Sequence, residues 1–237
     1  MQLLKNLYQV GGGLMNLTHT ELFDPFDECN TYLLDLGDAH LLFDCGNGET
    51  LDQIFTNLEY WNLLPNKITH CFLTHSHWDH AGAAHLLKER GVKLVSHPIT
   101  ADSVAAGDER CCGYLYHKTF IPCTVDQTLK DSSSITINNT TITAHHLPGH
   151  TKGCTAYEVN WNGKKLMFSG DVIGTLGYGD FGWDGSIDFD KMSYIKSLVK
   201  FAKMDFDVML GGHGLVTFAE PKRRVEESLN QALIQWR

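Results

Sequence analysis

Short apolar runs and longer segments with helical spacing alternate along the first part of the chain. The apolar runs are β-friendly and bounded by Gly, Asp or Asn, as strands are. The longer segments repeat apolar residues at helical spacing, with Leu51, Ile54 and Leu58 on one face. Strands are predicted over residues 32–36, 41–45, 68–73 and 92–96, and helices over residues 51–64 and 81–90.

The second part of the chain predicts a meander of strands followed by helices. A loop-like stretch over residues 107–122 precedes it, and Asn138-Asn139 and Asn162-Gly163 are turn signals between its apolar segments. Strands are predicted over 134–137, 140–146, 155–160, 165–168 and 208–210, and helices over 192–202 and 221–236, the last beginning at Pro221. We therefore expect an α+β fold in a single domain, 1–237, with sheet packed on sheet and helices outside.

Composition then excludes several classes of function. A chain of 237 residues that is 43% hydrophobic and 20% charged can bury a full core. It has no apolar run of about 18 residues, which excludes a membrane span, and no membrane partner is expected. It also lacks a secretory signal, so a cytoplasmic location is expected. A net charge of −9 argues against nucleic acid. Seven cysteines without a C-x-x-C pair predict reduced thiols.

A dense group of histidines follows the strand predicted over 68–73. In the segment THSHWDHAG, residues 74–82, alternation along an extended chain lets His75, His77 and Asp79 converge, and His80 follows as a helix begins. Three imidazoles and a carboxylate are costly to bury unpaired. A divalent cation satisfies all of them, because neutral imidazole and carboxylate are ligands for zinc or iron.

Further His and Asp residues stand where predicted strands give way to Gly-bearing loops. They are His150, Asp171 and His213. Small neighbours leave such side chains accessible at a strand end. Seven potential ligands are too many for one four-coordinate zinc, but they suit two metals that share a carboxylate.

The ordered combination of H-x-H-x-D-H with a later His, Asp and His resembles the metallo-β-lactamase fold superfamily. The resemblance covers nearly the whole chain and implies a four-layer αββα sandwich of two mixed β-sheets, with helices on the outer faces and the metals at one edge. It implies that His75, His77 and His150 hold the first metal, that Asp79, His80 and His213 hold the second, and that Asp171 bridges them. Zinc is the favoured metal, and iron and manganese also suit these ligands.

The expected reaction is hydrolysis of an ester, lactone or thioester of a small molecule. Two cations can share a bridging hydroxide at neutral pH, because metal binding lowers the pKa of water to about 7. Asp79 is the candidate catalytic residue, either orienting the nucleophile or passing its proton to the leaving group. Asp171 resembles the bridging residue of glyoxalase-II-like and lactonase-like hydrolases more than that of true β-lactamases.

The specific activities of glyoxalase II and of the lactonases cannot be assigned directly to this chain. The segment after His213 is too short for the substrate domain of glyoxalase II, and Val172, Ile173 and Gly174 occupy the stretch where lactonases have a Tyr. A persulfide dioxygenase is the alternative from another reaction class, with one iron held by His75, His150 and Asp171. A non-catalytic metal-binding module is a third hypothesis.

Two segments rich in glycine and aromatic residues are candidates for the wall of the substrate pocket. The first, residues 174–185, lacks a phosphate-binding pattern and contains Tyr178, Phe181 and Trp183. The second, residues 111–120, contains Tyr116 and His117. Surface packing explains either segment about as well, and a homodimer is also compatible with the aromatic content of 11%.

Overall fold

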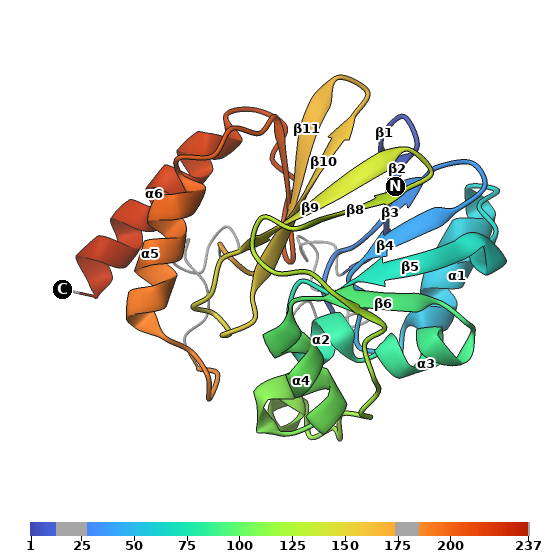
Figure 1. Ribbon diagram of the computed structural model, residues 1–237, viewed down its shortest axis with the longest axis horizontal. Helices are drawn as coiled ribbons and strands as arrows, with labels where there is room; N and C mark the ends of the chain where they lie inside the picture. The colour runs from blue at the N-terminus through green and yellow to red at the C-terminus, as the bar shows by residue number, and fades with distance from the viewer. Residues whose placement is uncertain (13–27, 174–184, 237) are drawn as a thin grey trace, which may run out of the picture.

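Two β-sheets face each other in a computed structural model that describes residues 1–12, 28–173 and 185–236 (Figure 1). Among these residues the first sheet has seven strands in sequence order, antiparallel up to β4 and parallel beyond it. Its strands are β1 (Gln2–Leu4), β2 (Leu7–Gly11), β3 (Thr31–Asp35), β4 (His40–Phe43), β5 (Ile68–Phe72), β6 (Lys93–Ser96) and β7 (Gln127–Thr128).

The second sheet runs in the order β12-β11-β10-β9-β8 and is antiparallel except for the pair β11 and β12. Its strands are β8 (Ser134–Ile137), β9 (Thr140–His146), β10 (Thr155–Trp161), β11 (Lys164–Gly170) and β12 (Val208–Gly211). Both sheets are therefore mixed, as expected.

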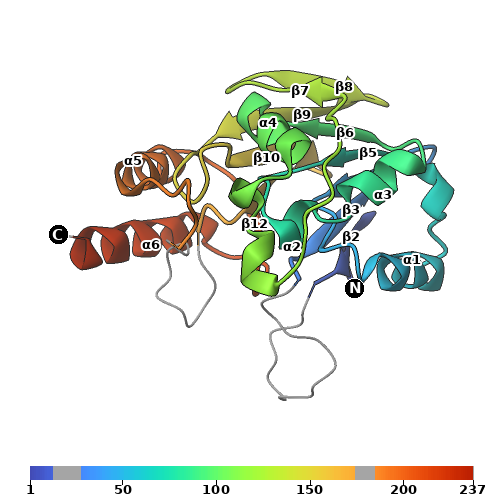
Figure 2. The same cartoon turned by 90° about the horizontal axis from the view of Figure 1, so that it is seen from below.

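Helices cover the outer face of each sheet (Figure 2). The first sheet is covered by α1 (Leu51–Tyr60), α2 (Trp78–Ala81), α3 (Ala84–Glu89) and α4 (Pro98–Ala106), and the second by α5 (Lys191–Phe201) and α6 (Pro221–Gln235). Short 3-10 turns lie at Pro65–Lys67, Glu109–Cys111 and Gly113–Tyr116.

Three apolar clusters separate these layers. In β3, Leu33 packs into the cluster between the first sheet and its helices, whereas Tyr32 and Leu34 pack into the cluster between the sheets. The rings of Phe43 and Phe168, from opposite sheets, stack with centroids 3.6 Å apart. A third cluster fills the space between the second sheet and α5 and α6. Strands buried on both faces read as continuous apolar runs, and the predicted four-layer αββα sandwich is confirmed.

Several element boundaries differ from the sequence predictions. The helix expected over 51–64 ends at Tyr60, because Asn62 adopts a left-handed conformation with φ of 56°. The helix expected over 81–90 begins already at Trp78 and is divided at Gly82 into α2 and α3. The strands β1, β2 and β7 and the helix α4 were not predicted.

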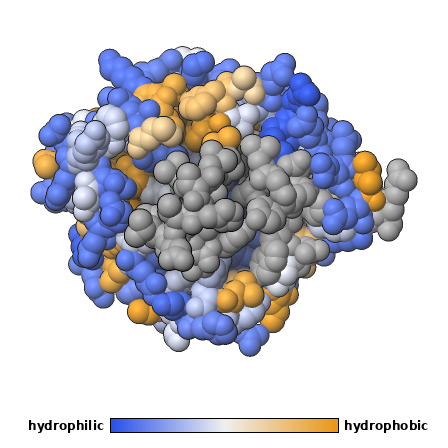
Figure 3. Space-filling model, turned by 180° about the vertical axis from the view of Figure 1, so that it is seen from behind, coloured by the Kyte–Doolittle hydropathy of each residue, from blue (hydrophilic) through white to orange (hydrophobic). Residues whose placement is uncertain are grey.

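One face of the molecule is mostly hydrophilic, with hydrophobic residues in several separate groups (Figure 3). Within the described residues, none of the helices combines the length and the apolar composition that a transmembrane segment needs.

Candidate metal centre

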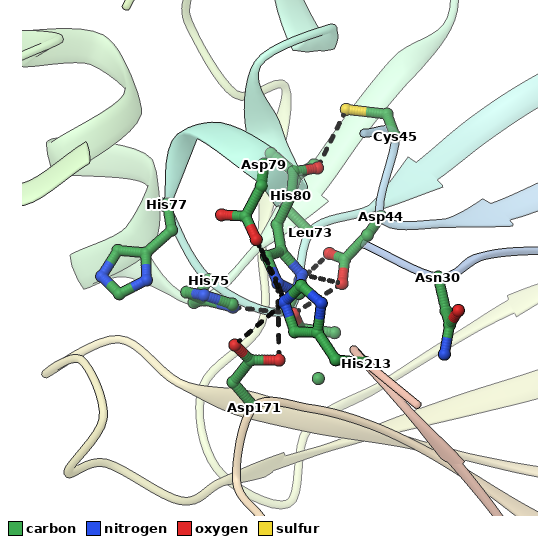
Figure 4. A network of polar contacts seen from close by, with 12 residues as sticks. Asn30, Asp44, Cys45, Leu73, His75, His77, Asp79, His80, Asp171 and His213 are labelled. Atoms are coloured by element: carbon green, nitrogen blue, oxygen red, sulfur yellow. Dashed lines mark hydrogen bonds and ion pairs between the residues drawn. The ribbon is translucent and has the colours of Figure 1, made fainter. Parts of the chain in front are cut away.

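The predicted ligands follow strands of both sheets and meet at one edge of the sandwich (Figure 4). The chain leaves β5 in an extended conformation and carries His75 and His77 before it enters α2, on which Asp79 and His80 lie. Asp171 follows β11 and His213 follows β12. Because β11 and β12 are parallel, their carboxyl ends lie at the same edge. The remaining ligand, His150, lies in the loop between β9 and β10.

His75, His77 and His150 form the first group of candidate ligands. All three are buried, and one ring nitrogen of each lies within 4.8 Å of those of the other two. His150 Nε2 and His77 Nδ1 are 3.0 Å apart. The structure thus brings together the three residues that the sequence assigns to the first metal.

Asp79, His80 and His213 form the second group. His213 Nε2 lies 3.0 Å from Asp79 Oδ2 and 3.2 Å from His80 Nε2. His80 Nε2 is in turn 3.4 Å from Asp79 Oδ2. These three atoms converge on one point, as a set of ligands for the predicted second metal requires.

Asp171 lies between the two groups. Its Oδ1 is 3.4 Å from His80 Nε2, and its Oδ2 is 3.5 Å from both His150 Nε2 and His213 Nε2. One carboxylate therefore reaches a histidine of the first group and two histidines of the second. A ligand shared by two metals, the role expected of Asp171, would need this position.

The charges of these buried groups suit a cation. Burial lowers the pKa values of His75 and His77 well below the ordinary value, so both imidazoles are neutral, the form that binds metals. Burial opposes ionisation of Asp171, but the neighbouring histidines, His213 first, hold its pKa well below the ordinary value. Burial also opposes a charge on His213, yet Asp171 and Asp79 raise its pKa to about 10. The two carboxylates therefore attract positive charge into this site.

Asp44 and Thr74 set which ring nitrogen of two candidate ligands faces the centre. Asp44 Oδ2 accepts hydrogen bonds from His80 Nδ1 at 2.8 Å and from Thr74 Oγ1 at 2.8 Å. Since the hydroxyl of Thr74 already donates to Asp44, it accepts from His75 Nδ1, 3.1 Å away. Both histidines therefore present Nε2 to the centre.

His75 Nε2 provides a test of whether the residues fit a metal. Among the described residues, this buried nitrogen has no hydrogen-bond partner. A buried acceptor without a partner is costly, and it lies beside other imidazole and carboxylate donors of the kind that zinc, iron and manganese prefer. The residues fit divalent metal ions.

Neither Asp44 nor Thr74 was identified as a candidate from the sequence. Asp44 follows the apolar run of β4 and precedes Cys45-Gly46, much as Asp171 follows β11. The available signal was thus a carboxylate at the end of an apolar strand. A third unpredicted neighbour is Cys29, whose sulfur lies within 4.8 Å of ligand atoms of Asp44 and His80.

The predicted substrate-binding residues remain predictions. The ring of Tyr116 packs against that of Trp78, with centroids 5.0 Å apart, and His117 is exposed. Tyr178, Phe181 and Trp183 lie outside the described residues. A small hollow beside His213 is lined by residues that were not predicted, which are Ile173, Met209, Gly211, Leu215, Thr217 and Arg224.

The seven cysteines all lie in the described part of the chain, and none forms a disulfide. Six of them are buried and Cys123 is half-buried. Burial raises the pKa of Cys154 to about 12 and that of Cys123 to about 11, so both are protonated thiols. That the thiols are reduced remains an expectation from the sequence.

Comparisons with curated proteins connect the chain to hydrolases. It is 32% identical over 187 residues to a hydroxyacylglutathione hydrolase of Bdellovibrio bacteriovorus, covering 76% of this chain and 63% of that protein. It is 25% identical over 208 residues to an atrochrysone carboxyl ACP thioesterase of Aspergillus fumigatus, covering 85% of this chain and 55% of that protein. The chain thus spans less than two thirds of the length of these relatives.

Solved structures share the fold. A metallo-beta-lactamase of Cronobacter sakazakii matches with a TM-score of 0.79 at 20% identity, over 100% of this chain and 96% of that one. BJP-1, a subclass B3 metallo-beta-lactamase of Bradyrhizobium japonicum, matches with a TM-score of 0.73 at 24% identity, over 99% of this chain and 91% of that one.

A family model decides the assignment. The model of the metallo-beta-lactamase superfamily matches residues 24–213, from the segment before β3 to the last candidate ligand, His213. With the fold and the clustered histidines and aspartates, this match shows that the chain belongs to the metallo-beta-lactamase superfamily.

Proposed function

We propose that this protein is a metal-dependent hydrolase with two divalent cations, zinc being the favoured metal, and that it cleaves a thioester, ester or lactone of a small molecule. The position of Asp171 carries the proposal. Its two oxygens lie within 3.5 Å of histidines from both groups, as a ligand shared by two metals requires.

The names of the relatives favour the thioester within this class. One is named a hydroxyacylglutathione hydrolase and another an ACP thioesterase, and both names denote cleavage of an acyl group from sulfur. Because this chain covers only 63% and 55% of those proteins, their glutathione and carrier-protein partners are not included in the proposal.

Two cations, when bound, supply a hydroxide nucleophile at neutral pH and polarise the carbonyl of the substrate. The chain's own residues hold the reacting groups in place. His75, His77 and His150 would hold one cation, and Asp79, His80 and His213 the other.

Metal content and a substrate screen test the proposed function together. The protein is purified without a His tag or chelator and analysed for metals, and it is then assayed against matched thioesters, esters and lactones. We expect two divalent ions per chain and hydrolysis that is lost with a chelator and restored by zinc. One iron per chain together with oxygen uptake on a persulfide would overturn the hydrolase in favour of a dioxygenase, and bound metal without turnover would favour a binding module.

Asp79 is proposed to move a proton between the nucleophile and the leaving group. It is buried at the centre, 3.0 Å from His213 Nε2, where a carboxylate can accept the proton of the attacking hydroxide and pass it to the departing sulfur or oxygen. Asp79→Asn, assayed with both metals bound, should lower kcat by about 10²–10⁴-fold. Unchanged turnover in the fully metallated variant would contradict this role.

A further inference from the structure

The loop that carries His213 has little rigidity of its own. Gly211, Gly212 and Gly214 surround the histidine, and glycine is the most flexible residue in a chain. The base of the loop is closed by two backbone hydrogen bonds between Met209 and Thr217, at 3.0 and 2.9 Å. Its tip must be held by contacts from elsewhere.

Asn30, from the opposite sheet, provides such contacts. It lies directly before β3, and its Nδ2 donates to Gly211 O at 3.1 Å and to Gly214 O at 3.0 Å. Its backbone N–H donates to Gly212 O at 2.6 Å. A single residue thus binds three carbonyls that flank His213, and Figure 4 shows it on the opposite side of that histidine from His77.

We propose that Asn30 is a positioning residue that holds His213 in place as a ligand of the second metal. Asn30 is 2% exposed, and its Oδ1 accepts a hydrogen bond from Gln9 Nε2 at 2.7 Å. Position 30 therefore needs a short side chain with two donor hydrogens and one acceptor, which asparagine supplies.

The effect of Asn30 is confined to one metal. Asp79 and His80, the other ligands of the second group, lie on α2 and not on the loop. The first group contains no residue of this loop. Loss of the Asn30 contacts should therefore weaken the second site and leave the first unchanged.

Space around Gly212 makes the position of the loop critical. A Cβ atom at residue 212 would lie 2.1 Å from Asp171 Oδ1 and 2.6 Å from His80 Cε1. The backbone of the loop therefore lies directly against two other ligands. The loop can therefore be displaced only away from these ligands, and such a displacement moves His213 out of reach of the ion.

Zinc titration of Asn30→Leu tests the proposal, which rests on the proposed two-metal centre. Leucine has a similar size and removes the three side-chain hydrogen bonds, and the Met209–Thr217 base and the donation from Tyr32 Oη to Gly211 O at 2.7 Å remain. We expect the second zinc to bind about 10–100-fold more weakly and the first to bind as in the wild type. Gln9→Leu is the matched control, because it removes only the bond to Oδ1 and should leave both affinities unchanged.

Hydrogen exchange of the metal-free protein gives a second readout that does not depend on metal number. Asn30→Leu should speed amide exchange over residues 211–214 and leave β10 unchanged. An equal loss at both metals, or wild-type affinities with unchanged exchange in the loop, would overturn the role of Asn30. One zinc per wild-type chain would instead overturn the two-metal proposal. The exchange data would then decide by themselves whether Asn30 holds the loop in place.

Discussion

At the scale of single residues, the carboxylate of Asp44 organises ligands that it does not itself join. It is buried and accepts hydrogen bonds from Thr74 N at 2.7 Å, from Thr74 Oγ1 and from His80 Nδ1. A carboxylate accepts all three because it offers only acceptors. Asparagine has the same shape, but one of its two polar atoms is an NH₂ group, which cannot accept. This group would face either the two donors at Oδ2 or the backbone N–H at Oδ1.

Asp44→Asn should therefore weaken metal binding, although residue 44 itself does not contact the metal. We expect an affinity loss of about 10–100-fold, measured by competition with a chromophoric chelator. Asp35→Asn is the matched control, since Asp35 Oδ1 pairs with His40 Nδ1 at 3.1 Å away from the centre. Equal affinities in wild type and Asp44→Asn would contradict the proposed orientation of His80.

Sequence reasoning identified the seven candidate ligands but not the residues that orient them. The ligands form a motif of fixed spacing with later His and Asp residues at strand ends. Asp44 and Asn30 act through contacts to residues 30 to 184 positions away, as the bonds to Thr74 and Gly214 show. Such partners depend on how the two sheets meet, which the spacing of residues along the chain does not specify.

At the scale of elements, the end of β9 and the start of α4 meet through two stacked histidines. The rings of His97 and His146 lie 3.9 Å apart at an angle of 8°. His97 caps α4, with its Nδ1 accepting from Ile99 N at 3.3 Å, and His146 Nε2 donates to Lys152 O at 2.9 Å. Burial and the neighbouring His146 lower the pKa of His97 to about 4.

This pair should make the fold sensitive to acid. The pKa of His97 is near 6.5 in the unfolded chain, so below that pH the unfolded chain binds a proton that the folded one excludes. The stability contribution is present above pH 6.5 and is lost progressively down to about pH 4, by at most about 3 kcal/mol.

His97→Asn keeps a capping acceptor and removes the titrating ring. In urea unfolding at pH 7 and pH 5, we expect a smaller difference in the free energy of unfolding for this variant than for the wild type. His117→Asn, at an exposed histidine, should retain the wild-type difference. If His97→Asn loses as much stability as the wild type between the two pH values, the stacked pair has no such effect.

The elements that sequence reasoning predicted and those it missed differ in what they bury. Central strands such as β3 and β4 carry apolar residues on both faces and stand out as continuous runs. The helix α4 was missed because its buried residues include Thr100 and Ser103 beside Val104, which gives no apolar stripe. The strand β7 has only two residues and is defined by its pairing with β6.

At the scale of the whole molecule, the candidate centre joins the two halves of the sandwich. His75, His77, Asp79 and His80 follow a strand of the first sheet, whereas His150, Asp171 and His213 follow strands of the second. Each candidate group combines ligands from both sheets, so a cation held by either group would link the sheets at this edge. In the unfolded chain the ligands of the first sheet lie far in sequence from those of the second, so the chain binds such an ion weakly.

Removal of divalent ions should therefore lower the melting temperature. A ligand present at about 100 times its Kd stabilises a fold by about 2.7 kcal/mol, and for a chain of this size 1 kcal/mol corresponds to about 2–4 °C. We expect a fall of roughly 5–10 °C in a circular dichroism melt after chelation. Zinc should restore the original temperature, and a chelator saturated with zinc beforehand should have no effect. Because both sheets supply ligands, the loss should appear as a shift of one cooperative transition, and a melting temperature unchanged by chelation would show that the ions do not link the two halves.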